Sequence, residues 1–298
     1  MRAYSIMSSI LDVLRREMPS LTRTERMIAL ELMRSYPSAG LETVAEFARR
    51  AGTSSPSILR FVAKLKFRSY ADFQSQLRAE VSQVLQSPLS RSSAMRGKES
   101  VAEDSFGAAA VGNISRAVEL LDAVDMDAVV SLVADERRPL FLIGGRFSKA
   151  NALWTYQLLR DIRGNIRLVE EEPANYAHSL LAINRTSVLI AFDYRRYQED
   201  IVAYAAAARQ RRATLIAVTD EWLSPIAAQA AHVFTTPVAA PSLFDSTIGS
   251  LVQMEALIAR TAEALGQKAA TRIAAVEVER ERFSGDVPAK AKPAKRKI

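Results

Sequence analysis

The chain has 298 residues, of which 49% are apolar and 24% charged, and it contains no cysteine. This length suits two domains, each with a hydrophobic core of its own. The missing thiols exclude disulfides, thiol nucleophiles and cysteine metal sites and fit a reducing, cytoplasmic location. No uncharged apolar run is long enough to span a membrane, so we expect no membrane partner.

The net charge of +7 is distributed unevenly. Residues 1–100 have a net charge of +7, residues 101–284 of −4, and residues 285–298 of +4. A basic N-terminal module suggests a polyanionic partner, most often nucleic acid. A basic surface that only keeps the protein in solution explains the charge equally well.

The first 85 residues are predicted to form an all-helical domain. Residues 22–25 match a capping box at the start of an apolar-periodic stretch. Pro37 and Gly40 are expected to end that helix. Three more helices are predicted at about 41–51, 55–67 and 70–85.

Residues 42–67 have the features of a helix-turn-helix. Ala48 is small enough for two helices to touch there, and Gly52 tolerates the positive φ of a tight turn. The second helix has an apolar stripe at helical spacing, formed by Ile58, Phe61, Val62 and Leu65. Ser55 can cap this helix, with proline as its first residue.

Burial of that stripe turns the opposite face of the second helix toward solvent. Ser57 and Arg60 are the candidates for contacts with base edges in double-stranded DNA. The capping serine is a further DNA-binding candidate, and basic side chains around the helix are candidates for phosphate contacts. These candidates are Ser55 and Arg49, Arg50, Lys64, Lys66 and Arg68. A plain helical bundle with a solvated basic face is the alternative.

The stretch from Leu21 to Leu77 resembles the N-terminal domain of RpiR/MurR-type transcriptional regulators. The matching residues include Leu21, Thr22, Glu25, Val44, Ala45, Gly52, Ser54, Ile58, Arg60, Phe61, Leu65, Phe67, Tyr70 and Phe73. In that family the segment after the turn usually ends Leu-Gly-Phe, whereas here it is Leu65-Lys66-Phe67. We predict that this domain binds a palindromic or repeated DNA operator as part of a homodimer or homotetramer, because paired half-sites mirror the symmetry of the protein.

Residues 86–105 are rich in serine and charge without an apolar period and are predicted to form a linker. From 106 to 283, short apolar runs alternate with helical stretches, which is typical of an α/β three-layer sandwich with a parallel sheet. Residues 284–298 are predicted to be a basic, disordered tail. Five strands are expected, at 140–143, 166–169, 187–192, 214–218 and 233–235.

Two loops after these strands are candidates for binding a small anion. After the first strand come Gly144, Gly145, Arg146 and Ser148, where glycine lets a ligand approach the backbone. After the third come Asp193, Arg195 and Arg196, whose guanidinium groups could hold a carboxylate or phosphate. A simple tight turn and a surface ion-pair cluster with Asp193, Glu199 and Asp200 are the alternatives.

Residues 107–266 resemble the SIS (sugar isomerase) domain of the same family, which binds phosphorylated sugars and helps the protein to dimerise. Such domains usually have a Ser-x-Ser-Gly-x-Thr phosphate loop after the third strand, but here Tyr194–Tyr197 (Tyr-Arg-Arg-Tyr) replaces it. Either the arginines hold an anionic group or the effector is not a sugar phosphate. Ser242, Asp245 and Ser246 could supply polar groups to the same pocket.

Together these features predict a transcriptional regulator that senses a small, anionic, carbohydrate-related metabolite. The rival prediction is an SIS-type sugar-phosphate isomerase or lyase with a helical extension, using His178 beside Glu170–Glu172 for acid-base chemistry. His232 is expected to be a packed core residue. A scaffold that only oligomerises is a third possibility. We predict no catalytic residue, cofactor or metal site, because two distant histidines make a poor ligand set.

Overall fold

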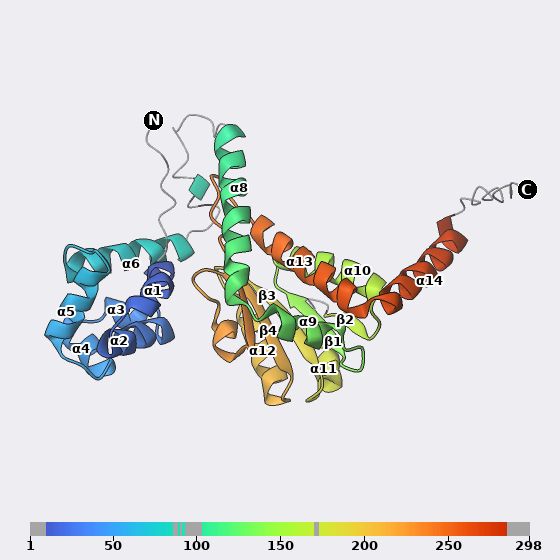
Figure 1. Ribbon diagram of the computed structural model, residues 1–298, viewed down its shortest axis with the longest axis horizontal. Helices are drawn as coiled ribbons and strands as arrows, with labels where there is room; N and C mark the ends of the chain where they lie inside the picture. The colour runs from blue at the N-terminus through green and yellow to red at the C-terminus, as the bar shows by residue number, and fades with distance from the viewer. Residues whose placement is uncertain (1–9, 86–88, 90, 93–102, 170–172, 285–298) are drawn as a thin grey trace, which may run out of the picture.

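The computed structural model describes residues 10–85, 89, 91–92, 103–169 and 173–284 of the chain. An all-helical N-terminal domain precedes a C-terminal domain built on a five-stranded sheet (Figure 1). This is the predicted fold class. The basic tail lies outside the described residues, and none of the described helices is long and apolar enough to cross a membrane.

The N-terminal domain is a bundle of short helices, each started by a local signal. The predicted capping box is present: Thr22 and Glu25 each accept a backbone N–H from the other. Thr43 and Glu46 form a second capping box. The helices are α1 (Ile10–Glu17), η1 (Met18–Ser20, 3₁₀), α2 (Arg23–Arg34), α3 (Ser38–Leu41), α4 (Val44–Arg50), α5 (Ser55–Lys64) and α6 (Tyr70–Leu85).

The predicted helix at 41–51 is corrected in two respects. Leu41 ends the short helix α3, and the next helix starts at Val44 because Thr43 is its N-cap. Gly40 lies inside α3 rather than after a helix. A β-carbon there would collide with Leu77 of α6, so this glycine allows close packing of the two helices.

The core of the N-terminal domain gathers apolar side chains from every one of its α-helices. Phe47 of α4, Phe61 of α5 and Phe73 of α6 are completely buried in it. The buried carboxylate of Glu80 accepts the backbone N–H of Ile10 over 3.0 Å, which joins the start of α1 to α6. The helix-turn-helix is therefore held on a continuous apolar base.

The sheet of the C-terminal domain is fully parallel, in the order β2-β1-β3-β4-β5. All residues of β1 and β3 are buried, as expected of strands covered on both faces. All five predicted strands are confirmed to within two residues. They are β1 (Leu140–Gly144), β2 (Ile166–Leu168), β3 (Val188–Asp193), β4 (Thr214–Asp220) and β5 (His232–Thr236).

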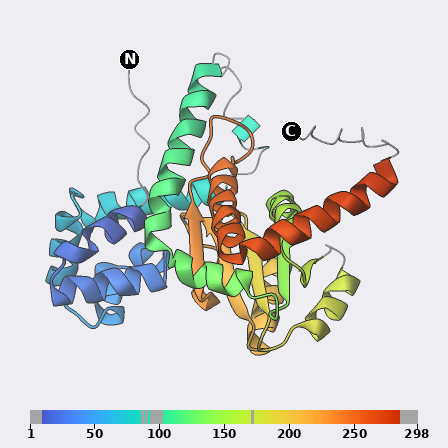
Figure 2. The same ribbon diagram turned by 45° about the vertical axis from the view of Figure 1, so that its right-hand side comes forward.

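Helices cover both faces of this sheet, which completes the predicted three layers. One apolar cluster joins the sheet to α9, α10 and α13, and another joins it to α11, α12 and η3. Helix α8 packs along α13, and α14 projects away from the sheet (Figure 2). The helices are α8 (Glu103–Glu119), η2 (Leu120–Ala123, 3₁₀), α9 (Met126–Ala134), α10 (Lys149–Ile162), α11 (Pro173–Ala182), α12 (Glu199–Gln210), η3 (Pro225–Gln229, 3₁₀), α13 (Ile248–Leu265) and α14 (Gln267–Ser284).

The segment between the domains and one loop of the C-terminal domain bear on how the two domains are joined. Helix α8 starts at Glu103, inside the segment predicted as linker, and the described linker residues Leu89, Arg91 and Ser92 have helical backbone conformation. Leu223, after β4, packs against the core of the N-terminal domain. Its φ of 63° is rare for a leucine, so local structure alone does not favour this placement.

Candidate functional site

The helix-turn-helix has the predicted internal geometry. Gly52 has a φ of 62°, and the turn is closed by the backbone N–H of Thr53, which donates to Ala48 O over 2.9 Å. Ile58, Phe61 and Val62 of α5 are buried. The opposite face of α5 is exposed and includes Arg60, so a second helix with an outward basic face is present, as a DNA reader requires.

The start of α5 differs from the expectation. Its N-cap is Ser54 rather than Ser55, and the Ser54 side chain makes no capping bond. Instead Ser54 Oγ lies 3.0 Å from Ser57 Oγ, and Arg60 donates to Ser57 Oγ over 3.2 Å. Ser57 and Arg60 therefore form one polar group on the exposed face of α5.

The basic candidates fall into two groups. Lys66, which has a φ of 69°, Arg68 and Arg49 are exposed. Lys64 is already engaged, because its Nζ donates to Glu25 Oε2 over 2.7 Å and to Ser20 O over 3.0 Å. Arg50 forms an ion pair with Glu42, and this pairing raises the pKa of its guanidinium.

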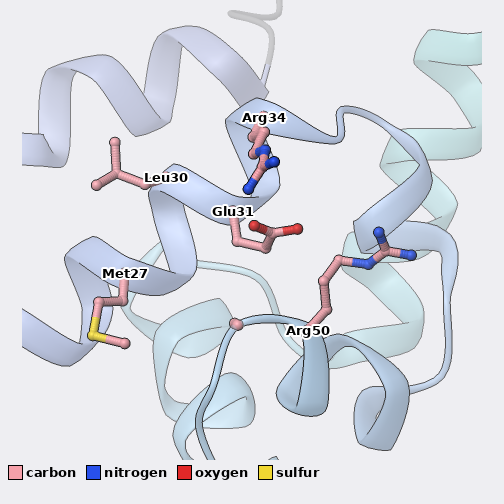
Figure 3. Close-up of a pocket in the computed structure, with 6 residues that line it drawn as sticks. Met27, Leu30, Glu31, Arg34 and Arg50 are labelled. Atoms are coloured by element: carbon pink, nitrogen blue, oxygen red, sulfur yellow. The ribbon is translucent and has the colours of Figure 1, made fainter.

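Arg50 also borders a surface hollow on α2 (Figure 3). The hollow has a mixed lining, in which Glu31 lies between Arg34 and Arg50 beside the apolar side chains of Met27 and Leu30. Arg50 is a predicted contact for DNA phosphate. In the structure it lies near two carboxylates, those of Glu42 and Glu31.

In the C-terminal domain, the loop after β1 is fixed by Ser148. Its hydroxyl accepts the backbone N–H of Gly145 and donates to Phe192 O of β3, both over 2.8 Å. A β-carbon on Gly144 would collide with the backbone of Ser148, so the tight turn requires glycine. Arg146 is exposed, with its guanidinium 5.3 Å from the centroid of the Phe147 ring.

The loop after β3 sends neighbouring side chains in different directions. Tyr194 is buried, and its hydroxyl donates to Ser250 of α13 and accepts from Asn151 of α10 over 3.4 Å. Arg195 points inward, whereas Arg196 is exposed with a φ of 62°. The two arginines were predicted to hold one anion together, but only Arg195 faces the interior.

Two buried carboxylates lie at the ends of β3 and β4. Burial raises the pKa of Asp193 to about 7, against hydrogen bonds from Ser224 Oγ and the Gln198 N–H. Burial also raises the pKa of Asp220 to about 6, against a hydrogen bond from Tyr197. Both groups can therefore change charge near neutral pH.

Arg195 is paired with Asp245, from the loop before α13. Its Nε donates to Asp245 Oδ2 over 2.6 Å, and a second nitrogen donates to Oδ1. Arg91 of the linker donates to the same Oδ1 over 2.7 Å. The predicted surface cluster of arginine with Asp193, Glu199 and Asp200 is thus wrong about the partner of Arg195.

The remaining candidates of the 240s loop lie beside this pair. Ser242 Oγ accepts the Phe244 N–H over 3.3 Å, and the Ser246 N–H donates to Val238 O. The ring of Phe244 lies 6.1 Å from that of Phe147, between centroids. The three predicted loops therefore meet at the carboxyl edge of the sheet, as expected for an open parallel sheet.

Sequence reasoning missed several residues of this site. Asp220 ends β4 and Trp222 follows it, and both were recognisable by position, since ligands bind where parallel strands end. Trp222 stacks with Arg195, whose guanidinium lies 5.0 Å from the ring centroid. Arg91 had no recognisable signal, because it lies in a segment without apolar periodicity.

The described structure does not bring the proposed acid-base residues together. His178 is exposed on α11, Glu170–Glu172 lie outside the described residues, and His232 at the start of β5 is only partly buried. The expectation of a packed core histidine is therefore wrong. No cluster of three potential metal ligands occurs in the part of the chain that the structure describes.

The C-terminal domain matches a known protein family. The model of the SIS domain matches residues 133–260. This part of the chain is therefore similar to SIS domains. The chain is 30% identical over 139 residues to an HTH-type transcriptional regulator of Providencia stuartii, covering 46% of this chain and 49% of the relative. The match therefore spans about half the length of that relative.

A second relative and two solved structures extend the match. An HTH-type transcriptional regulator of Haemophilus influenzae is 22% identical over 241 residues, covering 78% of this chain and 81% of the relative. The sugar isomerase domain of an RpiR transcription factor from Sphaerobacter thermophilus has a TM-score of 0.54 and 22% identity, covering 58% of this chain and 96% of its own. The Vibrio vulnificus NanR protein complexed with ManNAc-6P has a TM-score of 0.54 and 15% identity, covering 93% and 99%.

These matches agree with the SIS fold. The predicted resemblance to RpiR-type regulators with an SIS domain is confirmed. The structural likeness itself concerns the fold, because both identities are low.

Proposed function

We propose that this protein is a DNA-binding transcriptional regulator whose SIS domain binds a small, anionic, sugar-derived effector. The observation that carries the proposal is the combination of an exposed basic face on α5 with an inward-facing arginine at the carboxyl edge of the SIS sheet. The first fits a reader of DNA, and the second fits an oxyanion. The names of the two curated relatives point the same way.

On the DNA side, Ser57 and Arg60 are the proposed base contacts. An arginine fork can bond two acceptors of guanine, and Ser57 already orients Arg60. Arg49, Lys66 and Arg68 are exposed and are the proposed phosphate contacts. Ser55, Arg50 and Lys64 stay secondary candidates, the last two because carboxylates already pair with them.

On the effector side, the proposed binding residues are those that the three loops bring together. They are Gly144, Gly145, Arg146, Ser148, Asp193, Arg195, Arg196, Ser242, Asp245 and Ser246. The NanR structure holds ManNAc-6P, which supports a phosphorylated sugar as the first class to test. The buried ring of Tyr194 occupies part of the space beside the loop after β3. We therefore expect the anionic group of the effector to be held by guanidinium and backbone N–H groups rather than by hydroxyls.

The DNA test is fluorescence anisotropy of the full chain on duplexes from upstream of its own gene, with a scrambled duplex as control. Arg60→Ala should weaken sequence-dependent binding by about 1–3 kcal/mol. Arg78→Ala removes an exposed arginine of α6 and should leave this binding unchanged. Equal weak binding of all variants to every duplex tested would contradict the regulator proposal.

The effector test is thermal unfolding in the presence of phosphorylated sugars, ManNAc-6P among them, and of the same sugars without phosphate. Selective stabilisation by one compound, and a change in DNA affinity with it, is the expected result. A homodimer or homotetramer is proposed from the two-fold symmetry of operators, and sedimentation velocity measures it directly.

An isomerase or lyase is the second candidate function. The pKa of Asp193, raised to about 7, suits a general base at neutral pH. Its carboxylate is already engaged by Ser224 and Gln198, which leaves it poorly placed to abstract a proton. Isomer exchange of sugar phosphates, followed by NMR with wild type and Asp193→Asn, tests this alternative.

A further inference from the structure

One carboxylate holds two arginines from distant parts of the chain. Asp245 accepts two hydrogen bonds from Arg195 and one from Arg91, although 154 residues separate Asp245 from Arg91. The side chain of Arg195 is 4% exposed and that of Arg91 12%, whereas Asp245 is 24% exposed. The guanidinium groups are thus more deeply placed than the acid that joins them.

Two guanidinium groups share one carboxylate in this cluster. Arg195 and Arg91 both donate to Asp245, and the buried carboxylate of Asp220 is a further acid whose pKa the charge of Arg195 lowers. Burial tends to raise the pKa of Asp245, but the hydrogen bonds and charges of Arg195 and Arg91 outweigh it and hold that pKa below its usual value. Asp245 is therefore ionised at neutral pH, and two arginines that already hold one carboxylate can hold another oxyanion in its place.

Trp222 adds an unused hydrogen-bond donor beside Arg195. Its ring stacks with the guanidinium, and its indole Nε1 is buried with no hydrogen-bond partner among the described residues. A buried donor without an acceptor is costly, so such groups commonly mark a bound molecule or functional surface. An oxyanion between the arginines and this indole would supply the acceptor.

The carboxylate of Asp245 binds Arg195 in the way that the carboxylate or phosphate of a ligand binds an arginine. Its two oxygens accept from Nε and a terminal nitrogen of Arg195, the same arrangement that a free carboxylate or phosphate makes with arginine. Asp245 therefore stands where the anionic group of a ligand would stand.

We propose that Arg195 and Arg91 together form the effector's oxyanion site, that Asp245 occupies it as an internal anion, and that a phosphate or carboxylate ligand replaces Asp245. The proposal rests on the effector side of the proposed function. Arg91 belongs to the linker between α6 and α8, so the ligand contacts the connection to the DNA-binding domain directly. Replacement of Asp245 then changes how the linker is held, which is a physical route from effector to DNA affinity.

The test uses Trp222 as a reporter. Trp154→Phe in the full chain leaves Trp222 as the sole tryptophan, since the sequence contains two. Its emission is titrated with inorganic phosphate, and separately with gluconate as the carboxylate probe. The dissociation constants of the two probes tell a phosphate site from a carboxylate site.

In this background Asp245→Asn removes the internal charge and should tighten binding of the preferred probe at least about fivefold. Arg91→Ala should weaken binding at least about fivefold, and the double variant Asp245→Asn/Arg91→Ala should lose the tighter binding of Asp245→Asn alone. Arg91→Lys should bind the probe more tightly than Arg91→Ala, because lysine restores the charge without the forked hydrogen bonds. Asp127→Asn removes the carboxylate of an exposed pair with Arg260 and should change nothing.

Weaker or equal binding after Asp245→Asn, equal binding after Arg91→Ala, or no binding of either probe to any variant overturns the proposal. Thermal unfolding checks that each variant is folded, and Asp245→Ser serves if the asparagine variant is not. The DNA titration is separate. If these binding changes are found but the chain does not bind DNA, the oxyanion site stands and the regulator proposal fails. If the chain binds its operator but these binding changes are not found, the regulator proposal stands and the oxyanion site fails.

Discussion

The phenolic hydroxyl of Tyr197 donates to Asp220 Oδ1 over 2.9 Å. The backbone N–H groups of Arg195 and Trp222 donate to the same carboxylate, which is completely buried. The loop after β3 is in this way tied to the end of β4. The tyrosine that closes the Tyr-Arg-Arg-Tyr segment therefore orders the segment itself and positions Arg195.

Tyr197→Phe removes this hydrogen bond and leaves a buried carboxylate with one donor fewer. We expect the free energy of unfolding to fall by about 1–3 kcal/mol. The loss should be larger at pH 8 than at pH 5, because burial has raised the pKa of Asp220 to about 6 and the ionised form needs the donor more. Urea unfolding at both pH values measures it, with Tyr156→Phe on α10 as the control. Equal losses for the two variants would contradict this role of Tyr197.

Arg163 offers a prediction about the fold rather than the site. Its side chain is completely buried at the end of α10, and it donates to the carbonyl oxygens of Val133, Arg138 and Gly164 over 2.5, 2.8 and 2.9 Å. Burial lowers the pKa of this guanidinium. The side chain thus satisfies carbonyl groups of three segments around the start of β1.

Arg163→Met keeps much of the volume but leaves these carbonyl oxygens without their donor. We expect a loss of about 3 kcal/mol or more in the free energy of unfolding, and nearly as much for Arg163→Lys, whose single nitrogen cannot replace the fork. The matched control is Arg137→Met, since the Arg137 side chain is 90% exposed. Chemical unfolding of the three variants decides, and a methionine variant as stable as the control would refute the assignment.

The elements predicted correctly are those with local signals. The capping box at Thr22 uses residues three apart, and the strands are apolar runs whose burial on both faces follows from composition. The interactions of the candidate site are not local. Nothing near Arg91 in the sequence identifies Asp245 as its partner.

The loop after β3 shows the limit most clearly. From sequence, Arg195 and Arg196 are equivalent neighbours. They separate because Arg196 adopts a left-handed φ while Arg195 turns toward Asp245 and Trp222. That choice depends on side chains brought in by β4 and by the loop before α13, which no pattern within the segment contains.

The salt dependence of DNA binding separates the basic residues of the N-terminal domain. Removing one side chain that neutralises a DNA phosphate should reduce the slope of log affinity against log salt by about 1. Lys66→Gln and Arg68→Gln should each do so, because both side chains are exposed. Lys64→Gln should have a smaller effect, because Glu25 already holds its ammonium group. A salt series by anisotropy compares the three variants. An equal reduction of slope for Lys64→Gln would mean that Lys64 also contacts a DNA phosphate.

Asp193 makes stability depend on pH. Its pKa is about 7 in the folded chain, whereas the ordinary value of an aspartate side chain is 3.8. Between these values the folded state holds a proton that the unfolded state releases. The contribution to stability is therefore complete below about pH 3.8 and is lost as the pH rises through about 7.

Asp193→Asn is neutral at every pH, so this loss should disappear. Relative to wild type, the variant should gain more than about 1 kcal/mol in free energy of unfolding between pH 5 and pH 8. Asp220, whose pKa is also raised, should contribute to the pH dependence of the free energy of unfolding in both proteins. Urea unfolding at pH 5, 6, 7 and 8 measures the difference, with the exposed Asp122→Asn as the control. If the curves of wild type and Asp193→Asn stay parallel across this range, Asp193 is ionised in the folded protein throughout, and its pKa cannot be near 7.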